Sequence, residues 1–224
     1  MDHAEAPDSV TTRLREGFER IALVLRSDLW TASGAAGLNP TQAQTLAMLA
    51  ARPAGLRARE LAAHLAVSPP TIADTLAALE RKGLVSRAPD TTDARAMRVR
   101  LTDQGQRMGR AIAQAGSQVS VALARLSPAE QGDLLLSQIR IIRSLQQAGA
   151  IPEQRMCVSC RHFRPNAHPG AAQPHHCDFV NAAIGDRDLR LDCGEHETAD
   201  PAIQSANWTV FDHRRPPLQA ALEA

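Results

Sequence analysis

The chain has 224 residues, 44% hydrophobic but only 3% aromatic, which is enough apolar material for a core built largely from small side chains. Its 25 Lys and Arg nearly balance 24 Asp and Glu, so the net charge of +1 excludes a uniformly basic protein, and any basic surface must be local. No apolar run reaches the roughly 18 residues of a membrane helix, and the N-terminus lacks the apolar core of a signal peptide. We therefore expect a cytoplasmic protein without a membrane partner.

The first part of the chain shows helical periodicity interrupted by turn signals. Apolar residues recur every three or four positions over residues 9–31, which predicts one long amphipathic helix. Shorter helices are expected over residues 41–50 and 57–65. Ser68 is expected to cap a fourth helix, and Gly83 to end it in a left-handed conformation.

After residue 84 the pattern changes from helical to alternating. Alternation over residues 85–87 and 97–101, around the turn-forming residues 89–93, predicts a β-hairpin. A long helix is then expected from Thr102 to about residue 126, and another over residues 127–145. Beyond these helices the sequence becomes loop-rich, and it ends in a tail that shows no clear helix or strand pattern.

A helix, a short turn, a capped helix and then a charged hairpin are the order of a winged helix-turn-helix. The segments RARELAAHLAVSPPTIADTLAALERKGLVSR and DARAMRVRLTDQG resemble the MarR family of transcriptional regulators, over about residues 9–147. This resemblance implies a mainly α fold with a small β-hairpin wing. It also implies an obligate homodimer, held by the N-terminal helix and the last two helices of this region, that reads a pseudo-palindromic operator in double-stranded DNA.

The DNA contacts are predicted on the helix after Ser68 and on the hairpin. The start of that helix should enter the major groove, while the wing arginines reach a narrow minor groove or phosphates. Asp93 is expected to orient Arg95. Asp74 stands where related regulators often carry a basic residue, so it should repel phosphates, and the alternative is that it accepts a hydrogen bond from a cytosine amino group. Each arginine taken alone can also be a solvated surface charge. The predicted contact residues are Ser68, Pro70, Thr71, Asp74, Thr75, Arg87, Asp93, Arg95 and Arg98.

All four cysteines of the chain, Cys157, Cys160, Cys177 and Cys193, follow the pattern C-x2-C-x16-C-x15-C. Such a set suits a tetrahedral zinc ion or an iron–sulfur cluster, and four unligated buried thiols are the third alternative. The cluster is favoured because most zinc ribbons use two C-x2-C pairs and this chain has one. The spacing is also similar to that of high-potential iron–sulfur proteins, which hold a four-iron (4Fe-4S) cluster. His176 and His196 are the best candidates to replace a cysteine, although an outer or solvated role is favoured for both.

These patterns predict a MarR-like DNA-binding and dimerisation domain over residues 1–150, a cysteine-rich metal or iron–sulfur module over 151–215, and a tail over 216–224. The favoured function is a transcriptional regulator whose cysteine centre senses redox, oxygen or iron state. One alternative is a regulator with structural zinc that responds to a small aromatic ligand. A redox enzyme or electron carrier is the third, but the sequence shows no nucleophile–base pattern, nucleotide-binding glycine motif or partner cysteine pair to support it.

Overall fold

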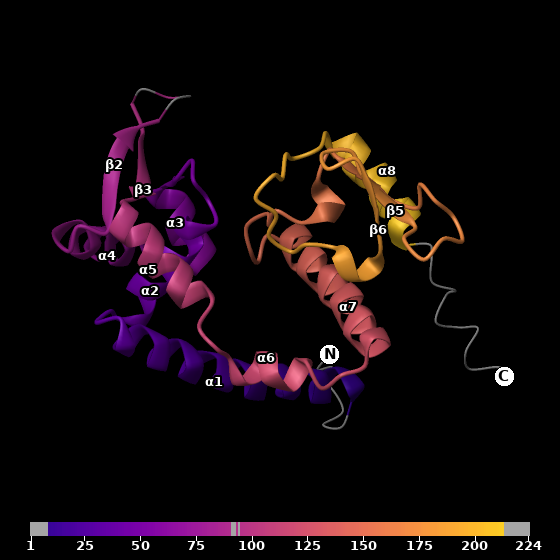
Figure 1. Ribbon diagram of the computed structural model, residues 1–224, viewed down its shortest axis with the longest axis horizontal. Coiled ribbons are helices and arrows are strands. Elements are labelled where there is room, and N and C mark those ends of the chain that lie inside the picture. Colours follow the sequence, from indigo (N-terminus) through magenta and orange to yellow (C-terminus); the bar gives the residue numbers. More distant parts are fainter. Residues whose placement is uncertain (1–8, 91–92, 94, 213–224) are drawn as a thin grey trace, which may run out of the picture. The chain divides into compact units, whose positions relative to one another are not determined.

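The computed structural model describes residues 9–212 apart from 91, 92 and 94, so the predicted tail lies outside the described residues. The chain forms two compact units, Met1–Arg125 and Leu126–Ala224 (Figure 1). This division differs from the boundary predicted at residue 150. The reason is that the helix α7 (Pro128–Gln147) buries its Ile139 in the same core as residues of the cysteine-rich region.

The caps predicted at Ser68 and Thr102 are confirmed, and two further helices of the first unit, α1 and α2, are capped in the same way. Ser9, Asn39, Ser68 and Thr102 each accept a hydrogen bond from a backbone N–H of the first turn, and Gly83 after α4 has φ +67°. The helices are α1 (Val10–Ala35), α2 (Pro40–Ala50), α3 (Ala58–Leu65), α4 (Pro69–Arg81), α5 (Asp103–Ala113) and α6 (Gln118–Leu123).

The predicted hairpin is confirmed as β2 (Val85–Pro89) paired antiparallel with β3 (Met97–Leu101). A third strand, β1 (Leu56–Arg57), pairs with the other edge of β3, giving the order β1-β3-β2. Two residues are too few to show an alternating pattern, so β1 was not expected from the sequence. The sheet ties the segment before α3 to the base of the wing.

The single helix predicted over residues 102–126 is wrong, because the chain breaks between α5 and α6. The Asp28 carboxylate on α1 accepts hydrogen bonds from the Ser117 hydroxyl at 2.8 Å and from the Gln118 N–H at 2.9 Å. It thereby caps the start of α6, in a stretch that also contains the poor helix former Gly116. A tertiary contact from a residue about ninety positions away therefore sets this boundary.

The core of the first unit lies under α4 and the sheet, with buried side chains that include Leu46, Leu61, Ile72, Leu76, Leu79 and Val99. Helix α5 approaches this core closely through two glycines. A Cβ on Gly105 would lie 1.9 Å from the Leu84 carbonyl oxygen, and one on Gly109 would lie 2.6 Å from the Leu46 carbonyl oxygen. Only glycine fits at either position.

The second unit contains more regular structure than the loops and tail predicted from the sequence. After α7 come η1 (Cys157–Ser159), β4 (Phe163–Arg164), β5 (His175–Cys177), β6 (Ala182–Ile184), η2 (Asp186–Asp188) and α8 (Pro201–Asp212). The three strands pair antiparallel in the order β4-β5-β6. Strands of two or three residues give no readable period, so the small sheet could not be predicted from hydrophobic alternation.

Aromatic side chains build the core of this second unit. Phe163 and Phe211 pack against His175, whose side chain has no exposed surface, and Trp208 packs against Phe211. Both nitrogens of that ring are satisfied, because one accepts from the Asn166 N–H at 3.0 Å and the other lies 2.9 Å from the Asp186 carboxylate. Within the described residues, no helix combines the length and apolarity that crossing a bilayer requires.

Candidate DNA-binding surface and four-cysteine cavity

The exposed face of α4 carries most of the residues predicted to read the major groove. Ser68, Pro70, Thr71 and Asp74 are exposed. Thr75 is only 6% exposed, so the prediction that it faces solvent is wrong. Its hydroxyl donates to the Thr71 carbonyl at 2.8 Å, and its position places it on the same stripe as the core residues of α4.

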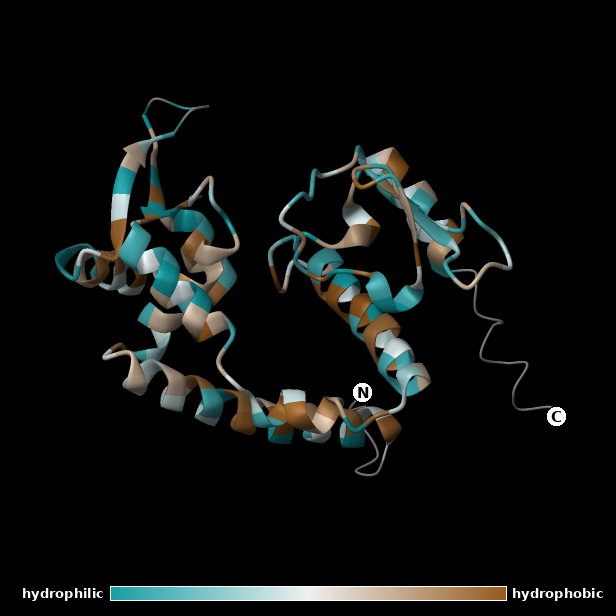
Figure 2. Cartoon of the chain, in the orientation of Figure 1, coloured by the Kyte–Doolittle hydropathy of each residue, from teal (hydrophilic) through white to brown (hydrophobic). Residues whose placement is uncertain are grey.

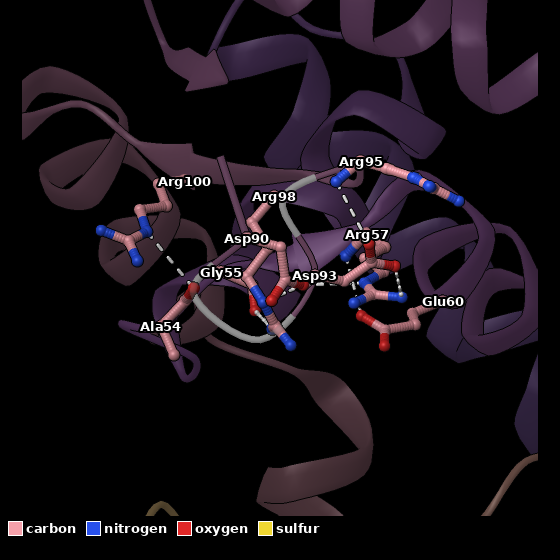
Figure 3. Close-up of polar contacts among 9 residues, drawn as sticks. All are labelled: Ala54, Gly55, Arg57, Glu60, Asp90, Asp93, Arg95, Arg98 and Arg100. Carbon is pink, nitrogen blue, oxygen red and sulfur yellow. Dashed lines mark hydrogen bonds and ion pairs between the residues drawn. The ribbon is translucent and has the colours of Figure 1, made fainter. Parts of the chain in front are cut away.

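A buried carboxylate, Asp90, organises the base of the wing (Figure 3). Its Oδ2 accepts hydrogen bonds from Arg57 Nε at 2.7 Å and from Arg98 Nε at 2.8 Å. Arg98 also donates to the Gly55 carbonyl at 2.9 Å. The hydrogen bond to Asp90 is the main reason that the pKa of Arg57 is raised above its usual value. The cluster clamps β1 and the segment before it onto the wing.

This arrangement changes the role expected for Arg98. The sequence places it near the wing tip as a DNA contact, but its guanidinium lies against Asp90 and Gly55 at the base of the wing. Arg57 and Asp90 were not singled out from the sequence. Asp90 was interpreted as a turn former only, and nothing in a local pattern indicates that two arginines from different strands converge on it.

Arg95, near the tip of the wing, is exposed to solvent and can contact DNA. The Asp93 carboxylate accepts a hydrogen bond from the Arg95 backbone N–H at 3.1 Å and lies 3.5 Å from the Arg57 guanidinium. Asp93 therefore holds the Arg95 main chain and not its guanidinium, and the Arg95 side chain extends away from Asp90 in Figure 3. Arg87, also exposed, forms an ion pair with Glu80 of α4 at 2.9 Å.

All four cysteines line one cavity of about 350 Å³ in the second unit. Cys157 lies on η1, Cys160 directly follows it, Cys177 ends β5, and Cys193 lies on the segment before α8. They are free thiols, so no disulfide competes for them. Other residues that line the cavity include His162, Phe163, Phe179, Val180, Ile184 and Arg190, together with the acidic residues Asp188 and Glu195.

Backbone hydrogen bonds bring the separate cysteine segments together. The Cys157 N–H donates to the Arg190 carbonyl at 3.1 Å, and the Arg190 N–H donates to Cys157 Sγ at 3.3 Å. The Cys193 N–H donates to the Arg155 carbonyl at 2.9 Å. Two of these three contacts join main-chain atoms only, and the third uses the Cys157 sulfur as its acceptor.

Burial raises the pKa of the Cys157 thiol to about 11, and the neighbouring cysteines act in the same direction. A bound cation is then needed to make this thiol a thiolate near neutral pH. Within the part of the chain that the structure describes, no three His, Cys, Asp or Glu side chains converge as ligands of a single metal ion. The four thiols border one cavity, and a set of four thiolates is a ligand set for either a zinc ion or an iron–sulfur cluster.

The two histidines proposed as substitute ligands make other contacts. His176 pairs with His168 at 3.3 Å, and His196 lies 3.0 Å from the Ser159 hydroxyl. Neither lines the cavity, whereas His162 does; its ring packs edge-on against Phe179. His176 precedes Cys177 in β5, and neighbouring residues of a strand point to opposite faces.

Comparison with known proteins covers the winged-helix part of the chain. Residues 36–96 match the model of the MarR family. *Staphylococcus aureus* MepR in its DNA-binding conformation is 25% identical, with a TM-score of 0.52 over 59% of this chain and 98% of that one. The first unit therefore has a winged-helix fold similar to that of the MarR family, and we call it the MarR-type unit. The transcriptional regulator SlyA shares the fold at 21% identity, with a TM-score of 0.50 over 58% of this chain and 94% of that one. Among curated proteins no sequence match was found.

The family match ends before the cysteines begin, so the cavity lies outside the segment that identifies the MarR-type unit. Asp90 and Arg57, by contrast, lie inside it, and Arg98 follows two residues after its end. The function of the MarR-type unit and that of the cavity therefore rest on separate observations.

Replacing Asp90 by Asn should loosen the wing of the MarR-type unit. Asn has nearly the same shape but no charge, so two half-buried guanidiniums lose their charged acceptor, at a cost of about 1–2 kcal/mol. We expect the melting temperature to fall by at least about 4 °C in thermal unfolding. Asp103→Asn makes the same change at an exposed site on α5 and should leave it unchanged. Equal melting temperatures for the two variants would contradict a stabilising role of Asp90.

Proposed function

We propose that this chain is a homodimeric transcriptional regulator that binds a pseudo-palindromic operator through its MarR-type unit. We further propose that Cys157, Cys160, Cys177 and Cys193 hold an iron–sulfur cluster whose state modulates that binding. The observation that carries the proposal is the presence of four thiols around one cavity in a chain whose other unit is a winged helix. This assigns the chain a regulatory role and not an enzymatic one.

DNA binding is supported by the exposed start of α4 and by the wing. The helix begins at Ser68 and presents its first turn to solvent, in the geometry by which helix-turn-helix proteins enter the major groove. Arg95 lies exposed on the wing with its backbone fixed by Asp93. A structure of *S. aureus* MepR with DNA, 24% identical with a TM-score of 0.50 over 58% of this chain and 97% of that one, shares the fold.

Dimerisation is supported by an apolar stripe on α1 (Figure 2). Its residues recur at helical spacing and leave between 45% and 63% of their surface exposed: Val10, Leu14, Phe18, Ile21 and Leu25. A contiguous exposed stripe of this kind is typical of a surface covered by a partner. Ile142 of α7, also expected in the dimer contact, packs instead against the core of the second unit.

The cysteine centre is proposed to act through the segments that carry the ligands. An iron–sulfur cluster, when bound, supplies a centre that responds to oxidants or to iron supply. The ligand thiolates come from η1, from β5 and from the segment before α8. When the cluster is bound, its four thiolate bonds hold these three segments together, and when it is lost the segments are less ordered. A local change of order of this kind is a common way to change the DNA affinity of a regulator.

A second candidate function keeps the DNA binding and gives the signal to a small molecule. A cavity of about 560 Å³ lies between α1 and α5 of the MarR-type unit. Its lining includes Met108, Ile112 and several alanines, together with Arg107, which suits a small aromatic molecule that carries an anionic group. In this alternative the cysteines hold structural zinc, for which four thiolates form a complete ligand set.

Arg95→Ala should weaken operator binding by roughly 1–3 kcal/mol if the side chain reads the groove, or lower the salt slope by about one if it contacts a phosphate. Fluorescence anisotropy with labelled operator at several salt concentrations separates these outcomes. Arg110→Ala on α5, an exposed arginine outside the predicted contact set, is the control. An affinity and salt slope equal to those of the wild type would remove Arg95 from the DNA contact.

Two experiments test the proposal as a whole. Protein purified without oxygen should be brown and contain iron and sulfide, whereas a zinc protein is colourless. The same preparation should bind DNA from its own promoter region with salt-dependent affinity. Zinc without iron would favour the second candidate function, and failure of both metal-loaded and metal-free protein to bind that DNA would overturn the regulator proposal.

A further inference from the structure

The exposed surface at the start of α4 offers very few polar groups to a ligand. In the first two turns the exposed residues are Pro69, Pro70, Thr71, Ala73 and Asp74. None is basic and none is an amide, so the side chains that most often read guanine and adenine are missing from this part of the helix.

The hydroxyl groups there are already engaged within the helix. The Ser68 and Thr71 hydroxyls lie 2.8 Å apart, and the Ser68 hydroxyl also accepts from the Thr71 N–H. The Thr75 hydroxyl donates to the Thr71 carbonyl and is buried. Asp74, in contrast, is exposed and has no hydrogen-bond or ion-pair partner among the described residues.

A carboxylate in the major groove discriminates between bases by charge. Cytosine presents an amino donor there, whereas guanine and thymine present acceptors that repel a carboxylate. Adenine presents an amino group beside the N7 acceptor, so it is an inferior partner. Pro70 and Ala73 lie one turn before and directly beside Asp74, and they offer only apolar surface, which suits a thymine methyl group.

We propose that Asp74 is a specificity-determining residue that selects cytosine in each operator half-site, with thymine beside it. This inference rests on the proposed DNA-binding function and specifies the sequence that the MarR-type unit reads. The carboxylate contributes selection and not affinity, since it repels phosphates. Affinity comes from groups that contact the phosphates or the minor groove, and Arg95 on the wing is the candidate among the predicted contacts.

The test is a binding selection from random double-stranded DNA with the full-length wild type, Asp74→Asn and Asp74→Ala. The wild type should enrich a cytosine at one position of each half-site. Asp74→Asn should move that preference to adenine, which pairs with an amide, and Asp74→Ala should lose the preference there while it keeps the rest of the motif. Replacing this C·G pair by T·A should weaken wild-type binding roughly five- to tenfold and Asp74→Ala binding less than about twofold.

Glu80→Gln is the matched control, because it also removes one negative charge from α4 but at a residue that pairs with Arg87. The Glu80→Gln variant should retain the preference for cytosine in each half-site. A wild-type motif without cytosine in its half-sites, or an unchanged motif in Asp74→Asn and Asp74→Ala, would overturn the inference and leave the regulator proposal intact. Failure of the wild type to select any DNA would overturn both. Thermal unfolding confirms that each variant is folded.

Discussion

Cys157→Ala and Cys193→Ala should each abolish visible absorption and bound iron, and should change operator affinity at the same time. Each substitution removes one of the four thiols around the cavity. The N–H groups of both residues keep their hydrogen bonds to the Arg190 and Arg155 carbonyls, and Cys157→Ala removes only the sulfur acceptor of the Arg190 N–H. We therefore expect loss of the centre without loss of the fold, measured by absorption spectra, iron analysis and fluorescence anisotropy.

Ser159→Ala is the control, because Ser159 lies between the first two cysteines but bonds to Met156 and His196, outside the cavity lining. It should keep both colour and affinity. A structural zinc site predicts a different result: no visible absorption in the wild type, and cysteine variants whose second unit unfolds. Colourless wild type with one zinc per chain would contradict the iron–sulfur assignment.

Leu14→Glu should convert the protein to a monomer and remove cooperative binding to the two half-sites. Leu14 is 59% exposed in the apolar stripe of α1, and burying one leucine contributes roughly 1.5–3 kcal/mol. A symmetric interface contains the residue twice, so the dissociation constant of the dimer should rise by on the order of a hundredfold or more. Light scattering at micromolar concentration measures the change.

Ile203→Glu places the same charge at a comparably exposed apolar residue, on α8. This variant should stay dimeric, because α8 lies outside the predicted dimer contact. A monomeric wild type in light scattering would contradict the dimer proposal. If Leu14→Glu and Ile203→Glu are both monomeric, the apolar surface used for association extends beyond α1.

Local signals predicted much of the MarR-type unit. Ser68 and Thr102 cap the helices that they were expected to cap, and Gly83 has the left-handed conformation expected at a helix end. The alternation around the wing predicted β2 and β3. These features depend on residues within a few positions of each other, which is the range over which capping and alternation are readable.

Features created by distant residues could not be predicted. Asp28 caps α6 from about ninety positions away. Asp90 accepts a hydrogen bond from Arg57, which lies in a different strand of the sheet. Thr75 was expected to face solvent because its residue type is polar, although its position on α4 belongs to the core stripe. The spacing of the cysteines indicated a shared centre, but the cavity that they border follows from the fold of the second unit.

The central claim is that the cysteine centre controls DNA binding, and one measurement tests it most directly. Operator affinity is compared at matched salt for protein with the centre intact, after oxidation and after its removal. Our account predicts that the intact form differs in affinity from both other forms, while circular dichroism shows that the second unit stays folded. Equal affinities of three folded forms would contradict the claim and assign the centre a structural role.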